Sequence, residues 1–200
     1  MNLFFDTETT GFPRRDLPLD HERQPRIVQL ACILAEDDGT ERASLSLIVR
    51  PDGWSIPAEA AAIHGIDDAL AERAGVPVEM ALRLLLGMAR QASLVVAHNV
   101  AFDIEIAQIG LNQIRQTDAA TEIGAMPRAC TMNLATPILK LPPTERMLAA
   151  GFNRPKAPKL AECVRHFFDE PLVGAHDALV DVRACARVYH HLMTMERAAA

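Results

Sequence analysis

The chain has 200 residues, half of them hydrophobic, and a formal net charge of −6. That length can bury one sizeable core, and no Pro/Gly/Ser-rich or highly charged linker divides it, so we expect a single domain over residues 1–200. The acidic balance argues against a generic nucleic-acid coat, because non-specific affinity comes from Lys and Arg. The longest apolar stretch, 81–89, contains Arg83, which argues against a membrane span there. Four scattered cysteines suit reduced thiols in the cytoplasm.

The hydrophobic pattern predicts a mixed α/β order along the chain. Strands are expected at residues 2–6, 27–35, 43–50, 93–97 and 128–131, with Asp37-Asp38-Gly39 as the turn between the second and the third. Helices are expected at residues 58–63, 67–74, 78–91, 100–114, 159–168 and 178–195, and one more after the last strand. The alanines at 198–200 are expected to fray.

Four acidic residues and one histidine are concentrated in three short blocks. These are FDTETTG at 5–11, HNVAFD at 98–103 and HDALVD at 176–181. Each carboxylate follows or interrupts an apolar run, so folding would carry these acids to the edge of a buried core. Unpaired negative charges repel one another there and are costly. A bound divalent cation is the simplest remedy.

The predicted elements place these acids close together. Asp6 and Glu8 are two residues apart at the end of a strand, so they share one face while Thr7 points to the other. Asp103 and Asp181 fall near the starts of two helices, where each can lean over the same strand end. Oxygen ligands of this kind suit two Mg²⁺ or Mn²⁺ ions better than they suit zinc.

A pair of such cations would clamp a scissile phosphate, which predicts phosphodiester hydrolysis. His176 stands five residues before Asp181 and is the candidate general base, because a neutral imidazole can accept a proton from water near neutral pH. Taken alone, His176 reads as a helix-capping or surface histidine. Its position beside the acids favours the catalytic role.

The three blocks resemble the three exonuclease motifs of the DEDDh branch of the DnaQ-like 3′-to-5′ exonucleases, a family similar to ribonuclease H in fold. The resemblance implies an α/β, ribonuclease H-like fold with a central mixed five-stranded sheet flanked by helices, as one exonuclease domain. It also implies hydrolysis from the 3′ end of single-stranded DNA, with release of nucleoside 5′-monophosphates. The implied metal ligands are Asp6, Glu8, Asp103 and Asp181, with His176 as the base.

The resemblance extends to the expected contacts with the terminal nucleotide. Ile63-His64-Gly65-Ile66 is similar to the family segment that lines the nucleotide pocket. His98 and Asn99 keep a structural alternative, as hydrogen-bond partners of the loop beneath Asp103. Phe102 is either a core residue or a platform on which a base stacks. The substrate-binding residues implied are Thr7, Thr9, Ile63, His64, Asn99 and Phe102.

Two segments outside the motifs carry further expectations. Basic residues outnumber acidic ones between residues 126 and 166, and we expect this stretch to steer a nucleic-acid strand toward the site. Residues 12–24 form a long, charged link between the first two strands and are predicted to make a flap near the site. The basic residues of the first segment are Arg128, Lys140, Arg146, Arg154, Lys156, Lys159 and Arg165.

Two other functions remain open at this point. The motifs do not distinguish deoxyribose from ribose, so the substrate could be short RNA or RNA 3′ ends. A non-catalytic nucleic-acid-binding or polymerase-docking module of the same fold is the other alternative, and the complete set of acids and histidine argues against it. The sequence gives no sign of a polymerase or membrane partner and leaves the oligomeric state undetermined.

Overall fold

A five-stranded sheet in the order β3-β2-β1-β4-β5 forms the centre of the computed structural model, which describes residues 1–199. β2 pairs antiparallel with β1 and β3, whereas β4 runs parallel to β1 and β5 parallel to β4. The expected mixed five-stranded sheet is therefore confirmed. Fraying was expected at residues 198–200, but Ala198 and Ala199 belong to the last helix, and Ala200 lies outside the described residues. The strands are β1 Asn2–Thr9, β2 Ile27–Ala35, β3 Glu41–Ile48, β4 Leu94–Ala97 and β5 Arg128–Cys130.

Nine helices are formed within residues 1–199, and two of them were not expected from the sequence. α5 packs against α4 and buries Ala119, Ala120 and Ile123. With one large apolar residue among these three, its sequence pattern gave little sign of a helix. α7 is a single short helix that begins where the Thr144 hydroxyl accepts the Met147 amide. The helices are α1 Ala58–His64, α2 Asp68–Ala74, α3 Val78–Ala89, α4 Val100–Gln113, α5 Thr117–Ala125, α6 Thr131–Leu139, α7 Glu145–Ala149, α8 Leu160–Phe168 and α9 Ala178–Ala199.

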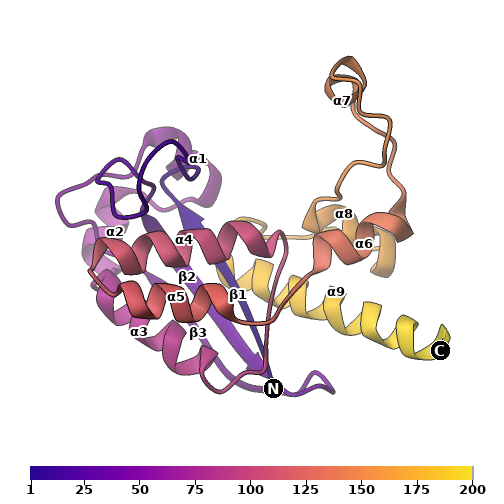
Figure 1. Cartoon of the computed structure of the whole chain (residues 1–200), viewed down its shortest axis with the longest axis horizontal. Helices are drawn as coiled ribbons and strands as arrows, with labels where there is room; N and C mark the ends of the chain where they lie inside the picture. The colour runs from indigo at the N-terminus through magenta and orange to yellow at the C-terminus, as the bar shows by residue number, and fades with distance from the viewer. Residues whose placement is uncertain (200) are drawn as a thin grey trace.

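Alternate residues of β1 anchor two separate cores. Leu3 and Phe5 are buried in the cluster that includes α3 and α4, while Phe4 is buried in the cluster that includes α9. Helices therefore cover both faces of the sheet (Figure 1). Because side chains alternate across a strand, Asp6 and Glu8 follow Phe4 toward α9, and Thr7 follows Phe5 toward α4.

A smaller core holds α6 and α8 against the far part of α9, with Ala135, Val164 and Val188 among its buried members. Between α6 and α8 the chain leaves the body of the molecule and carries α7 on a projecting arm (Figure 1). None of the helices within residues 1–199 is both long enough and apolar enough to cross a membrane.

Candidate active site

The predicted acids and histidine converge at the end of β1. Asp6, Glu8, Asp103, His176 and Asp181 all line one cavity of about 530 Å³. β1 continues beyond its expected end because its pairing with β2 runs on through Glu8 and Gln29, and a register shift follows Glu8. Such bulges bend a strand locally and re-aim side chains. Glu8 is the last residue of β1 before this irregularity, and it lines the cavity.

Asp103 is fixed by the residue between the two strand acids. It lies in the first turn of α4 and is only 2% exposed. Its Oδ1 atom accepts hydrogen bonds from the Thr7 amide at 3.1 Å and from the Thr7 hydroxyl at 2.9 Å. Thr7 is itself buried, so the structure places this predicted substrate contact as a partner of Asp103.

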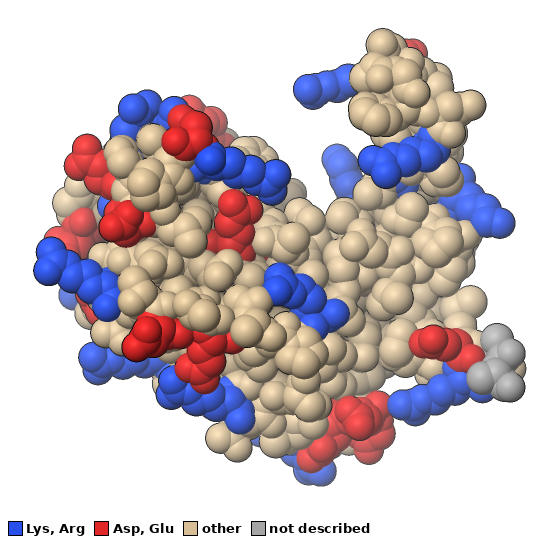
Figure 2. Space-filling view, viewed as in Figure 1, with Lys and Arg blue, Asp and Glu red and all other residues tan. Residues whose placement is uncertain are grey.

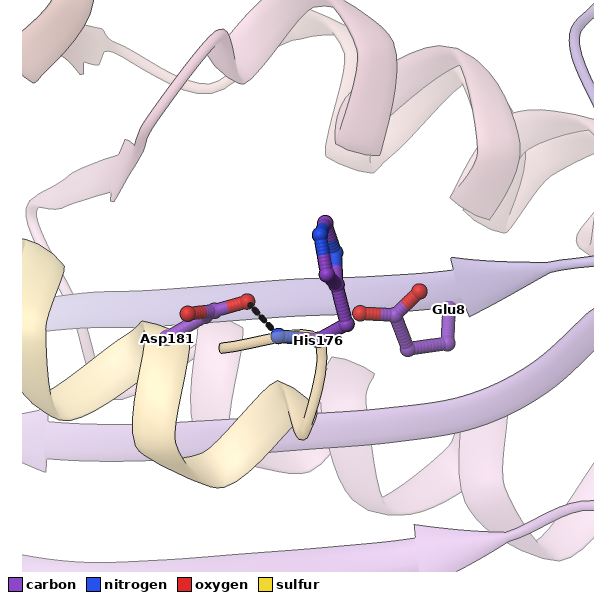
Figure 3. A group of neighbouring side chains, drawn as sticks. All are labelled: Glu8, His176 and Asp181. Atoms are coloured by element: carbon purple, nitrogen blue, oxygen red, sulfur yellow. Dashed lines mark hydrogen bonds between the residues drawn. The ribbon is translucent and has the colours of Figure 1, made fainter. Parts of the chain in front are cut away.

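Glu8, His176 and Asp181 form the outer part of the site. One ligand atom from each lies within 4.8 Å of the others. The His176 amide donates to Asp181 Oδ2 at 2.9 Å, and the imidazole is exposed between the two carboxylates (Figure 3). His176 has a φ of 69°, a conformation that is costly for a non-glycine residue and that recurs at functional sites.

The start of α9 is held by a residue that the sequence analysis did not single out. Gln29 is buried in β2, and its Oε1 atom accepts the Ala178 amide at 3.1 Å. Asp177 caps the same helix by accepting the Leu179 and Val180 amides at 3.0 and 3.2 Å. The available signal was a glutamine inside an otherwise apolar strand, because buried polar groups are kept where they are hydrogen-bonded.

The carboxylates of this site favour a bound cation. Desolvation, followed by repulsion from Asp181 and Asp103, raises the pKa of Glu8 to about 8. Burial raises the pKa of Asp103 to about 7, and burial with the neighbouring acids raises that of Asp6 well above its ordinary value. The Oδ1 atom of Asp181 is buried without a hydrogen-bond partner among the described residues. The clustered carboxylates would be stabilised by a nearby positive charge. Carboxylate oxygens are ligands that suit a hard divalent cation, and an imidazole lies beside them.

Most of the expected nucleotide contacts line the same cavity. Thr9, Ile63, His64 and Phe102 do so, although the Thr9 hydroxyl already donates to the Gly11 carbonyl at 2.7 Å. The His64 Nε2 atom is buried and has no partner within residues 1–199. Asn99 lines a neighbouring cavity of about 330 Å³, whose wall also includes Phe12 and Phe102, and its contact with substrate stays a prediction. Asn99 has a backbone φ of 75° and is the residue before α4 begins.

Residues 12–24 approach the site at their first residue. Phe12 is 84% exposed, and its ring meets that of Phe102 edge to face at 6.0 Å. Both rings line the active-site cavity. Buried Gln24 organises the segment, since it accepts the Arg14 amide at 2.9 Å and donates to the Arg14, Leu17 and Pro18 carbonyls. The roles of Phe12 and Gln24 within this segment were not predicted from the sequence.

Solved structures of exonucleases share this fold. Escherichia coli exonuclease I in complex with a dT13 oligonucleotide matches with a TM-score of 0.74 at 18% identity, over 99% of this chain and 42% of that one. Exonuclease X in complex with 5′ overhanging duplex DNA matches with a TM-score of 0.59 at 24% identity, over 98% and 93%. The chain thus spans about two-fifths of exonuclease I. A comparison with curated proteins finds no match.

The mixed five-stranded sheet flanked by helices has the ribonuclease H-like fold of these structures, and the expected fold class is confirmed. The sequence profile of the exonuclease family RNase_T matches residues 3–189. The chain belongs to this exonuclease family, which also confirms the resemblance to DEDDh-type, DnaQ-like exonucleases.

Proposed function

We propose that the protein is a metal-dependent 3′-to-5′ exonuclease that hydrolyses single-stranded DNA and releases nucleoside 5′-monophosphates. The observation that carries the proposal is the convergence of four carboxylates and one histidine on a single cavity. The acids come from β1, α4 and α9, which are far apart in the sequence. Their mutual repulsion is a cost that a structural role would not require.

The proposed metal ligands are Asp6, Glu8, Asp103 and Asp181, and the cofactor is two Mg²⁺ or Mn²⁺ ions. When bound, the cations would supply polarisation of the phosphoryl group and stabilisation of negative charge at the leaving oxygen. His176 lies between Glu8 and Asp181 and is exposed to the cavity, where solvent enters.

His176 acts as the general base in this proposal. Its imidazole takes a proton from the attacking water while the water oxygen bonds to phosphorus, and the bond between phosphorus and the 3′ oxygen of the preceding nucleotide breaks. That oxygen then takes a proton from solvent. The hydrogen bond from the His176 amide to Asp181 fixes the backbone that carries the imidazole.

The comparison with solved structures supports DNA as the substrate, and the cavity wall supports contact with a terminal base of either nucleic acid. The structural neighbours include exonuclease I with dT13 and exonuclease X with overhanging duplex DNA. Within this chain, Phe12, Ile63 and Phe102 give the cavity an apolar wall on which a terminal base can stack without sequence preference.

The test uses matched DNA and RNA oligonucleotides labelled at the 5′ end. With Mg²⁺ or Mn²⁺ we expect a ladder of DNA products shortened one nucleotide at a time from the 3′ end, together with free 5′-monophosphates. Asp181→Asn should remove the activity while the circular dichroism spectrum stays unchanged, and Asp20→Asn serves as the exposed control. Internal cleavage, shortening from the 5′ end or a metal-independent product would contradict the proposal, and faster RNA digestion would contradict the choice of DNA.

A further inference from the structure

The arm that carries α7 is poorly explained by packing within the chain. We define the arm as residues 140–158, which join α6 to α8 and stand clear of the sheet at the upper right of Figure 1. α7 has no buried residue, and Leu148 and Phe152 on the arm are 52% and 53% exposed. Ordering such a segment costs conformational entropy that little burial offsets. Its apolar surface is therefore available to a ligand.

The arm is basic although the protein as a whole is acidic. Its only acid is Glu145, against Lys140, Arg146, Arg154 and Lys156. Lys156 is neutralised by Glu162 of α8 at 2.6 Å, whereas the other three cations form no ion pair with the described residues. Figure 2 shows Lys and Arg side chains over the arm and its stem, facing a hollow beside the main body. This charge distribution fits a polyanion.

The arm and α6 enclose a cavity of about 720 Å³. Met132 and Pro137 of α6 and Met147 of the arm give it apolar walls. Phe152 and Arg154 also line it, with the Arg154 guanidinium 5.7 Å from the centre of the Phe152 ring. An aromatic ring beside an arginine is the combination that stacks a nucleobase and contacts its phosphate.

His98 connects this arm to the active site. Its Nε2 atom lies 3.0 Å from the carbonyl of Pro158, where the arm ends, and its Nδ1 atom lies 2.9 Å from the hydroxyl of Thr131, where α6 begins. A carbonyl can only accept, so Nε2 donates and Nδ1 accepts. The His98 ring also lines the active-site cavity. The end of the arm and the start of α6, the helix before the arm, are thus both hydrogen-bonded to His98, which lines the active-site cavity.

We propose that the arm cavity binds the nucleic-acid strand on the 5′ side of the nucleotide being removed. One base stacks on Phe152, and Arg146 and Arg154 contact the strand's phosphates. This inference rests on the proposed function, and it adds a second binding site to the same strand. Its recognition is independent of sequence, because every base offers a stacking face.

The experiment compares a strand of about 16 nucleotides, long enough to reach a neighbouring site, with the p-nitrophenyl ester of thymidine 5′-monophosphate, which occupies the active-site cavity alone. The variants are Arg146→Gln/Arg154→Gln and Phe152→Ala. The control is Arg73→Gln/Arg83→Gln, which removes the same charge from exposed positions on α2 and α3. KM for both substrates is measured over a range of salt concentrations.

We expect the arginine variant to weaken the log–log salt dependence of 1/KM for the long strand by about 1.4, because two phosphate contacts are lost. Phe152→Ala should raise that KM about fivefold or more. KM for the ester should be the same in the arm variants as in the wild type. The control variant should have the wild-type KM for both substrates. The inference would be overturned if the arm variants had the KM and salt dependence of the wild type on the long strand. It would also be overturned if their KM rose as much on the ester as on the long strand. A wild-type protein inactive on both substrates would instead overturn the proposed function.

Discussion

Replacing Asp103 by asparagine should stabilise the metal-free protein at alkaline pH. The asparagine Oδ1 atom can still accept both hydrogen bonds from Thr7, so the change removes charge and keeps the contacts. Burial raises the pKa of Asp103 to about 7, from an ordinary value of 3.8. Between these values the native state holds a proton that the unfolded chain releases, so stability falls as pH rises and levels off above pH 7. The gap of about 3 corresponds to about 4 kcal/mol.

The assay is urea unfolding of the wild type and Asp103→Asn in a chelating buffer. Only about a third of the penalty has developed at about pH 5, so the stability of the variant relative to the wild type should rise by about 3 kcal/mol between about pH 5 and about pH 8. Asp20→Asn, at an exposed position in the loop after β1, controls for general charge effects. A difference between Asp103→Asn and the wild type that does not change with pH would refute the reasoning.

The same variant separates charge repulsion from cation binding. At a Mg²⁺ concentration about 100 times the dissociation constant, the wild type should gain about 2.7 kcal/mol, because binding to the folded state stabilises it. Asp103→Asn should gain less, since it has lost a proposed ligand, and the stability advantage of the variant at about pH 8 should shrink or reverse. An equal gain in both proteins would show that Asp103 does not contribute to cation binding.

Three further substitutions each test the role of one residue. His176→Ala should lower kcat about 10²–10⁴-fold with KM nearly constant; unchanged kcat across the pH range would remove His176 as the base. Thr7→Val deletes the 2.9 Å bond to Asp103 and should lower stability by about 1 kcal/mol in urea unfolding, with Thr7→Ser restoring it. Gln24→Ala leaves the Arg14, Leu17 and Pro18 carbonyls without their partner, so limited proteolysis should cut within residues 12–24 sooner than in wild type.

The mixed α/β order and the location of the acids could be predicted because their signals are local, whereas the ribonuclease H-like fold was implied by the family resemblance. Apolar strands, two acids with a spacing of two, and acids in the first turns of α4 and α9 each follow from short-range periodicity. What short-range patterns could not supply is the partner of each side chain across the fold. Gln29 with Ala178, Thr7 with Asp103 and His98 with Pro158 are 149, 96 and 60 residues apart.

The cations of the arm could not be told apart from the sequence. The basic excess in residues 126–166 was visible, but the expectation treated its cations as equivalent. The structure separates Lys156, which is neutralised by Glu162, from Arg154, which lies against Phe152 at a cavity wall. A charge count cannot make this distinction, because a cation that is already paired has little left to offer a phosphate.

Three consecutive residues of β1 explain why the strand register matters to catalysis. Asp6 and Glu8 face α9, from which Asp181 approaches, while Thr7 faces α4 and holds Asp103. A shift of one residue would exchange the two faces, placing two acids in the core beneath α4 and a threonine among the ligands. Pairing of Phe5 with Cys32 and Glu8 with Gln29 opposes such a shift. The register that buries Phe4 and Phe5 in their separate cores is therefore the same one that assembles the carboxylates.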